Sequence, residues 1–150
     1  ICFGNARDAA KCLGYCEDGV DFINGDYDIC VDETHMINVV KEYNLKYLIT
    51  TLRDSISASD NGWSAAVCDG HTLYRGKQYK LHIVDRVGGG DSFASGFLHG
   101  IVSGMTMENS LEFAIAAAAI KHTIPGDINY ITETEILSLM NSDGSGRVQR

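Results

Sequence analysis

Residues 85–100 read DRVGGGDSFASGFLHG, and this stretch decides how the rest of the chain is interpreted. Gly88, Gly89 and Gly90 stand in a row, Asp91 follows directly, and the residues after it are typical of a helix. Glycine permits the positive φ angles of a tight turn, and backbone N–H groups where a turn enters a helix bind anions. The three glycines therefore predict an anion-binding turn.

The carboxylate of Asp91 adds a second chemical group to this turn. We expect it at the first position of the helix and ionised at neutral pH, because a helix N-terminus stabilises negative charge. Anion donors beside a carboxylate base suit phosphoryl transfer to a hydroxyl, since the donors stabilise the transferred group and the carboxylate accepts the hydroxyl proton. The residues alone equally allow a tight loop in which Asp91 only caps the helix.

Three rival motifs fail on spacing. The dinucleotide fingerprint G-x-G-x-x-G needs a third glycine sooner than Gly96, the first glycine after Gly90. The phosphate loop G-x-x-x-x-G-K-S/T needs a lysine after its last glycine, and none follows Gly90. GDS matches an esterase motif with Ser92 as nucleophile, but neither His99 nor His122 has the required aspartate three residues before it.

The composition is that of one globular domain, with 150 residues, 45% hydrophobic and 21% charged. A net charge of −8 without a basic tract argues against a nucleic-acid partner. The five scattered cysteines predict reduced thiols rather than a zinc site. The sequence shows no signal peptide and no long apolar span, so we expect no membrane partner and a cytoplasmic location.

Alternating strand and helix patterns predict an α/β fold in which helices cover a sheet. The run KYLITT at 46–51 is typical of a parallel strand buried on both faces, and CDGHT at 68–72 predicts a hairpin turn. SISASDNGW at 55–63 is expected to be a loop, and 142–150 a flexible tail. Helical patterns occupy 5–15, 33–44, 93–105, 107–122 and 132–141. We expect Asn5 to cap the first of these helices, Thr106 the fourth, and either Thr132 or Thr134 the last.

The stretch DRVGGGDSFASGF resembles the C-terminal signature of the PfkB (ribokinase-like) carbohydrate kinases: Asp, two variable residues, Gly, a small residue, Gly, Asp and a small-residue helix. Within that family TTLRDSISASDNGWSA, DRVGGGDSFASGFLHG and AAAIKHTIPGDIN are most similar to the 2-keto-3-deoxygluconate kinases. The likeness covers essentially the whole chain. It implies a ribokinase-like three-layer α/β/α (Rossmann-like) sheet.

The resemblance also implies that residues 1–150 are the C-terminal, nucleotide-binding and catalytic part of a single kinase domain. The chain begins ICFGNARD, without Met and at what reads as the end of a strand, which agrees with a piece of a longer protein. The sugar-binding strands and lid that the family places before this point would be absent. We therefore expect the 150 residues alone to be inactive.

The resemblance assigns roles to matching positions. Asp91 would be the base on the sugar hydroxyl, and Gly88, Gly89 and Gly90 the anion hole for the γ-phosphate of ATP. GNARDA resembles the family's N-x-x-E motif, which places Asn5 near the ATP phosphates and Asp8 in the magnesium and water shell. Asp8 is one methylene shorter than the usual Glu.

TLR resembles the family's T-L-G nucleotide loop, with Thr51 and the backbone near Arg53 approaching ATP. Arg53 replaces the commoner glycine, and its guanidinium would either reach phosphate or be solvated. Small residues around Ala116 would let adenine lie against the helix, or would serve close helix packing.

Two aspartates complete the implied site. Asp127 in PGDIN resembles a residue near the sugar. Asp85 and the backbone near Gly126 resemble a monovalent-cation site, and the alternative for Asp85 is a turn-capping role.

The implied activity is ATP-dependent phosphorylation of the primary hydroxyl of a sugar acid, 2-keto-3-deoxygluconate to its 6-phosphate, with Mg²⁺ bridging the ATP phosphates mostly through water. Another PfkB activity, such as fructokinase or ribokinase, is the nearest alternative. A non-catalytic module that binds nucleotide or sugar is the alternative from a different class. The oligomeric state is left open, a homo-oligomer included.

Overall fold

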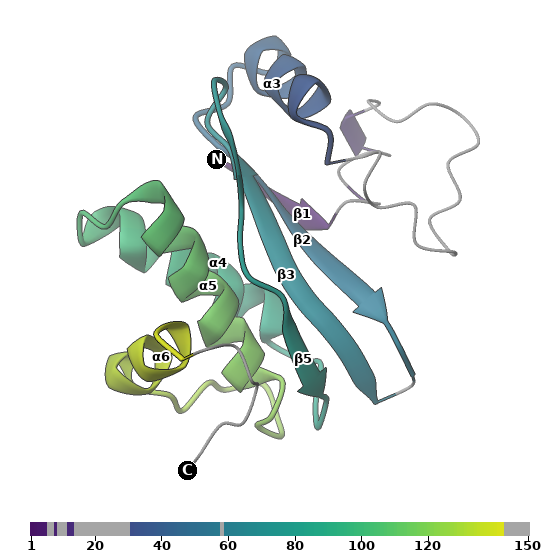
Figure 1. Ribbon diagram of the computed structural model, residues 1–150, viewed down its shortest axis with the longest axis vertical. Coiled ribbons are helices and arrows are strands. Elements are labelled where there is room, and N and C mark those ends of the chain that lie inside the picture. The colour runs from purple at the N-terminus through teal and green to yellow at the C-terminus, as the bar shows by residue number, and fades with distance from the viewer. Residues whose placement is uncertain (6–7, 9–11, 14–30, 58, 143–150) are drawn as a thin grey trace. The chain divides into compact units, whose positions relative to one another are not determined.

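The computed structural model describes residues 1–5, 8, 12–13, 31–57 and 59–142 (Figure 1). Nearly all of the tail expected at 142–150, and most of the helix expected at 5–15, lie outside these residues. The described residues fall into two units. The first unit is Ile1–Leu52 with Ala65–Arg75, and the second unit is Arg53–Ser64 with Gly76–Arg150. No helix within the described ranges is long and apolar enough to cross a membrane.

A mixed sheet of five strands runs in the order β1-β2-β3-β4, with β5 paired to β3. The β1–β2 pair is parallel, and β3 pairs antiparallel with both β4 and β5. The strands are β1 Cys2–Asn5, β2 Leu48–Ser55, β3 Asp60–Cys68, β4 Leu73–Arg75 and β5 Tyr79–His82. Together with the helices, this sheet confirms the α/β fold class.

In the first unit the predicted parallel strand is confirmed. Cys2 of β1 lies opposite Leu48 of β2, and the side chains of Leu48 and Ile49 are fully buried. Helix α3 (Glu33–Glu42) begins at Asp32, whose carboxylate accepts the His35 N–H at 3.1 Å. Its buried face, Met36, Val39 and Val40, belongs to one core cluster with Leu48, Ala66 and Cys68.

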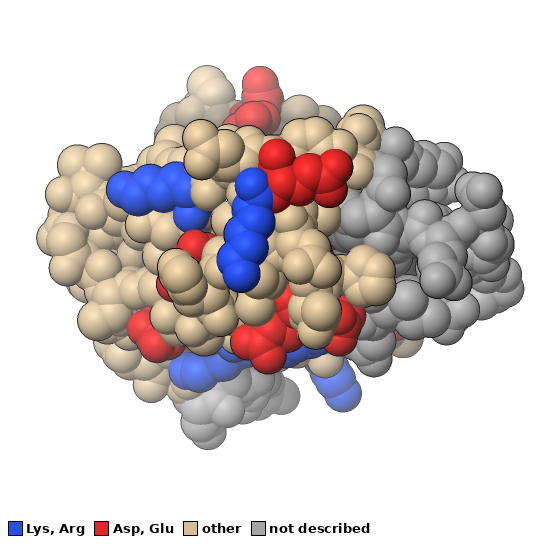
Figure 2. Space-filling model, turned by 90° about the horizontal axis from the view of Figure 1, so that it is seen from above, with Lys and Arg blue, Asp and Glu red and all other residues tan. Residues whose placement is uncertain are grey.

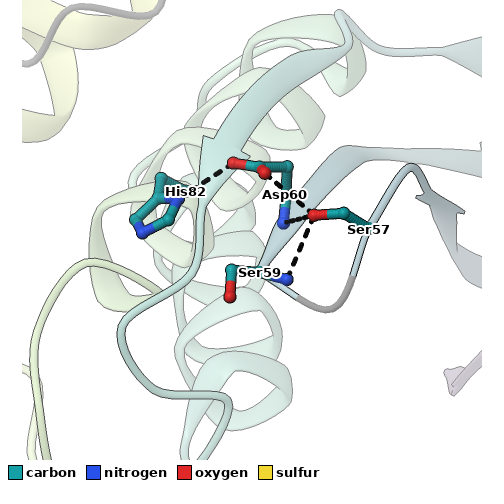
Figure 3. A network of polar contacts seen from close by, with 4 residues as sticks. All are labelled: Ser57, Ser59, Asp60 and His82. Atoms are coloured by element: carbon teal, nitrogen blue, oxygen red, sulfur yellow. Dashed lines mark hydrogen bonds and ion pairs between the residues drawn. The ribbon is translucent and has the colours of Figure 1, made fainter.

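In the second unit the turn between β2 and β3 is held by side chains (Figure 3). Ser57 Oγ donates to Asp60 Oδ2 at 2.8 Å and accepts the backbone N–H of Ser59 and of Asp60. The other oxygen of Asp60 bonds His82 Nδ1 at 2.9 Å. Strand β3 therefore begins at Asp60, and the loop predicted for 55–63 is wrong over its second half, because these residues pair with β5.

Three helices follow β5 in the second unit: α4 Gly89–Val102, α5 Met107–Lys121 and α6 Glu133–Met140. Helices α4 and α5 run side by side (Figure 1). Their backbones approach closely, because a Cβ at Gly96 would lie 3.1 Å from Ala114 Cα and one at Gly100 would lie 2.8 Å from Ser110 Cα.

The apolar residues of the helix predicted at 93–105 are expected to share one buried face, and this packing explains where that expectation is wrong. Phe93 and Phe97 are buried, but Leu98 is 42% exposed and Val102 is 86% exposed. The face that meets α5 is built from the phenylalanines and glycines instead. The predicted cap of α5 at Thr106 is confirmed, and the cap of α6 is Thr132, which forms a capping box with Glu135.

Candidate functional site

The glycine turn ends at Gly88, the N-cap of α4. Its backbone is left-handed, with φ 75° and ψ 0°. A Cβ at Gly88 would lie 2.5 Å from the backbone oxygen of Asp127 and 3.2 Å from Lys121 Cε. Glycine is therefore required here both by the φ angle and by the close approach of the 127 backbone. The same contact places Asp127, a predicted sugar-site residue, beside the turn.

The next two glycines differ from each other. A Cβ at Gly89 would lie 2.7 Å from Cε1 of His122, so this position is closed by packing. A Cβ at Gly90 would meet nothing within 4 Å, and Gly90 is exposed. Packing thus explains the absence of a side chain at Gly89 but not at Gly90. Open space kept beside Gly90 fits a group that approaches the backbone from solvent.

The start of α4 is the helix end that lacks a side-chain cap. Among the described helices, α3, α5 and α6 are capped by Asp32, Thr106 and Thr132, whereas Gly88 offers no side chain. The first-turn N–H groups of a helix have no partner within the helix. With the helix dipole, they make this end a binding place for an anion such as phosphate.

Asp91 is exposed and is the third residue of α4, not the first as predicted. The difference arises because Gly89 and Gly90 already have helical backbone. The carboxylate therefore lies one residue beyond the open position at Gly90. Asp91 nevertheless lies in the first turn of α4.

Positive charge gathers around this turn although the chain is acidic. Arg53, Lys121 and Arg86 each act electrostatically on His122, whose ring faces Gly89. On the face seen in Figure 2, Lys and Arg side chains lie next to Asp and Glu side chains. Of these three cations, the sequence analysis named only Arg53 as a candidate for binding phosphate.

The ring of His122 supports the turn from inside. His122 is 1% exposed, and its Nδ1 donates to the backbone oxygen of Ala118 at 2.6 Å. The ring lies 4.8 Å from the ring of Trp63, and the guanidinium of Arg53 lies 6.0 Å from the Trp63 ring centre. The residues Arg53, Trp63, His122 and Gly89 thus follow one another from the surface to the turn.

His122 predicts a pH-dependent stability. Burial lowers its pKa below the ordinary 6.5, against the opposing hydrogen bond to Ala118. Below pH 6.5 the His122 ring binds a proton in the unfolded chain but stays neutral in the folded chain. The contribution of His122 to the free energy of unfolding is therefore fully present above pH 6.5 and decreases as the pH falls below that value. We expect His122→Asn, which keeps a donor for Ala118, to reduce this slope by up to about 1.4 kcal/mol per pH unit.

The measurement is urea unfolding of both proteins across the range between neutral and mildly acidic pH. His71→Asn is the matched control, because His71 is exposed. Equal slopes for wild type and His122→Asn would show that His122 is not the titrating group.

Asp85 takes the turn-capping alternative. Its Oδ1 accepts the Val87 N–H at 3.0 Å and its Oδ2 accepts the Gly126 N–H at 2.7 Å, and these bonds hold the pKa of the carboxyl below its usual value. The Gly126 carbonyl accepts from Lys121 Nζ at 2.7 Å, and so does Ile124 O at 3.1 Å. The oxygens expected to bind a monovalent cation thus already accept hydrogen bonds from protein groups.

Asn5, Asp8 and Thr51 lie in the first unit. Asn5 Nδ2 donates to Asp8 Oδ2 at 2.6 Å, and Asn5 Oδ1 accepts the Asp8 N–H at 2.7 Å. The bond from the Asp8 N–H to the Asn5 side chain has the form of an N-cap, in agreement with the predicted helix start at Asn5. Thr51 lies opposite Asn5 in the β1–β2 pair. The spacing of three residues therefore has a structural reason in addition to any role toward ATP.

The described residues contain no group of three or more His, Cys, Asp or Glu that could hold a metal ion. A single exposed carboxylate such as Asp8 suits Mg²⁺, which keeps several waters and is bound largely through substrate phosphates.

Ala116 is fully buried, as close helix packing requires, and the expectation that adenine lies against this part of the helix stays a prediction.

A separate pocket of about 310 Å³ opens in the second unit. It lies among α4, α5, α6 and the segment before α6, and its lining includes Ser92, Gly96, His99, Phe113, Ala117, Asn129 and Glu133.

Comparison with known proteins identifies the family of the chain. Residues 5–134 match the model of the pfkB family carbohydrate kinases. The chain is similar to the 2-dehydro-3-deoxygalactonokinase of Haloferax volcanii, at 31% identity over 51% of this chain and 24% of that protein. It is similar to the 5-dehydro-2-deoxygluconokinase of Bacillus licheniformis, at 38% identity over 43% of this chain and 21% of that protein.

Solved structures are similar over most of the chain. The 2-dehydro-3-deoxygluconokinase of Thermotoga maritima matches with a TM-score of 0.81 at 36% identity, covering 93% of this chain and 40% of that one. The ribokinase of Arabidopsis thaliana, solved with ribose and ATP, matches with a TM-score of 0.68 at 19% identity over 94% of this chain and 40% of that one, which shows the shared fold. The ribokinase-like fold predicted from DRVGGGDSFASGF is confirmed, and the chain belongs to the pfkB family of carbohydrate kinases.

Proposed function

We propose that the complete protein transfers the γ-phosphate of ATP to a hydroxyl of a sugar acid. The observation that carries this proposal is the uncapped start of α4, where Gly90 faces open space beside the exposed carboxylate of Asp91. An anion site next to a base is what phosphoryl transfer to an alcohol requires. Membership of the pfkB family supports it, although this chain spans only a fifth to two fifths of the relatives named above.

Each group of the turn has a proposed role. The N–H groups of Gly89 and Gly90 hold the charge that develops on the transferred phosphoryl group, and Gly88 shapes the turn that presents them. Asp91 orients the sugar hydroxyl and accepts its proton. Arg53 adds positive potential beside the turn, held there by its contact with Trp63.

The remaining roles follow the resemblance to the family. Asn5 and Thr51 would contact the ATP phosphates, and Asp8 would belong to the water shell of Mg²⁺. Magnesium, when bound, neutralises phosphate charge. Asp127, beside Gly88, would contact the sugar.

For the substrate we propose 2-keto-3-deoxygluconate, converted to its 6-phosphate. The support is the similarity to the Thermotoga maritima 2-dehydro-3-deoxygluconokinase over almost the entire chain. A second candidate is 5-keto-2-deoxygluconate, because relatives named 5-dehydro-2-deoxygluconokinase reach 45% identity over 47 residues. Both substrates are deoxy keto sugar acids, so the proposed class does not depend on the choice between them.

The experiment is a coupled ADP-release assay on the complete protein with a panel of acceptors. The panel contains 2-keto-3-deoxygluconate, 2-keto-3-deoxygalactonate, 5-keto-2-deoxygluconate, ribose and fructose. We expect the highest kcat/KM with one of the three acids. Preference for ribose or fructose would contradict the proposal that the acceptor is a sugar acid. ATP binding without turnover of any acceptor would favour the alternative of a non-catalytic binding module.

Gly90→Ala tests the anion site without disturbing the fold. Because a Cβ at Gly90 meets nothing, we expect the free energy of unfolding to stay constant or to rise by about 0.5–1 kcal/mol. We expect kcat to fall by about tenfold or more, because the methyl group crowds the bound phosphate. The measurements are urea unfolding and steady-state kinetics.

Gly89→Ala is the contrasting variant. Its Cβ would collide with His122, so here stability should fall as well as activity. Full activity in a stable Gly90→Ala protein would show that phosphate does not approach this backbone.

A further inference from the structure

Lys121 is the least expected residue of the second unit. It is the last residue of α5, and its exposed fraction is 0%. Lysines are almost never fully buried, because removing an ammonium from water is costly unless it is paired and hydrogen-bonded. Here the ammonium donates to Gly126 O at 2.7 Å and to Ile124 O at 3.1 Å, both in the turn that follows α5.

The groups around this ammonium are those that bind a bare cation. Backbone carbonyl oxygens replace the water shell of monovalent cations in proteins. The Gly126 peptide faces charge on both sides, since its carbonyl accepts from Lys121 and its N–H donates to Asp85 Oδ2 at 2.7 Å. Lys121 also acts electrostatically on Asp85. The two carbonyl oxygens thus accept hydrogen bonds from a positive charge that belongs to the chain itself, and the Asp85 carboxylate lies within electrostatic reach of that charge.

This charge lies directly under the glycine turn. Lys121 Cε is 3.2 Å from where a Cβ of Gly88 would stand, and Asp127 O is 2.5 Å from the same point. Asp85 joins the two segments by accepting N–H groups from Val87, before the glycines, and from Gly126. Anything that holds the 124–127 turn in place therefore also holds the N-cap of α4.

We propose that the Lys121 ammonium takes the place of a bound monovalent cation: it supplies the positive charge that holds the carbonyl oxygens of the 124–127 turn. This protein therefore neither binds nor needs a monovalent cation at Asp85 and Gly126. Lys121 is a positioning residue: it acts through the 124–127 turn on the α4 N-terminus and contributes positive potential to it. The expected effect of Lys121 on activity rests on the proposed kinase function. The expected effect on melting temperature does not depend on whether the protein is a kinase.

Two substitutions separate charge from packing. Lys121→Met keeps an unbranched side chain in place but removes the charge, and it fills the space. Lys121→Ala removes the charge and leaves room among the carbonyl oxygens. Lys80→Met is the matched control, because Lys80 is an exposed lysine of β5 in the same unit.

The experiment measures melting temperature and kcat/KM of the complete protein in choline, Li⁺, Na⁺, K⁺ and NH₄⁺ chlorides at an ionic strength of about 0.15 M. We expect wild type and Lys80→Met to give the same values in all five salts. Loss of the buried charge leaves its carbonyl partners unpaired, so both Lys121 variants should melt roughly 4–8 °C lower in choline. K⁺ and NH₄⁺, the ions closest in size to the ammonium, should restore Lys121→Ala but not Lys121→Met.

Three results overturn the proposal. The first is wild-type activation or stabilisation by K⁺ or NH₄⁺ over choline, a measurement that needs no variant. The second is a Lys121→Met protein equal to wild type, which would make the charge irrelevant. The third is a Lys121→Ala protein that no cation restores in melting temperature. If no acceptor is phosphorylated, the kinase proposal fails, while the melting temperatures still decide the role of Lys121.

Discussion

Asp91→Asn is expected to lower kcat of the complete protein by roughly 10²-fold or more while ATP still binds, because general base catalysis contributes about 10²–10⁴-fold. The amide has the size of the carboxylate but cannot accept the hydroxyl proton. Asp91 is exposed in the first turn of α4, so the fold should lose only the helix-dipole contribution of about 0.3–1 kcal/mol. The measurements are steady-state kinetics and calorimetric ATP titration.

Glu108→Gln is the matched control, since Glu108 is an exposed acid in the first turn of α5. It should lose similar stability and no activity. Turnover of Asp91→Asn near the wild-type rate would remove Asp91 from the role of base, whatever the substrate.

The second large effect is expected on stability. Gly88→Ala should lower the free energy of unfolding by about 2–5 kcal/mol, because left-handed backbone costs an L-residue about 1–2 kcal/mol and overpacking against Asp127 O costs about 1–3 kcal/mol more. Gly104 offers a matched control, because its φ is also 75° but a Cβ there meets nothing within 4 Å. Gly104→Ala should lose only the backbone part.

Urea unfolding of the two glycine variants gives the comparison. The difference between them isolates the contact of Gly88 with the 127 backbone from the cost of the φ angle. Equal losses would mean that the chain relaxes away from this contact, and that the turn does not depend on close approach.

Elements whose causes are local were predictable from the sequence. The run of apolar residues around Leu48 gave a buried parallel strand, and Thr106 and Thr132 cap the helices that follow them. The start of β3 was missed for the opposite reason. Ser-Asp-Asn-Gly is typical of a turn, but Asn61 pairs with Leu81 of β5, and that pairing outweighs local preference.

The residues of the candidate site also fall into those that the sequence predicts and those that it does not. The glycines, their turn into α4 and the neighbouring Asp91 could be predicted because they are contiguous. Lys121 could not, since a lysine in the last turn of a helix is typical of a solvated cation at the negative end of the dipole. Its burial depends on Asp85 and Gly126, which the fold brings together from distant parts of the second unit.

The bare N-terminus of α4 also bears on how this protein tolerates change. Three described helices gain stability from a capping side chain, and the fourth begins at glycines that supply none. A capping side chain cannot be added at Gly88, where glycine is required, but glycine at the helical position Gly90 costs about 0.5–1 kcal/mol relative to Ala, so stability is left unoptimised there. Selection of a variant library for thermal resistance alone would favour side chains that fill the space at Gly90, and the same side chains would crowd the phosphate that we propose to bind there. Stability and function oppose each other at this one turn, and variants enriched by a heat screen but depleted by a growth screen should concentrate there.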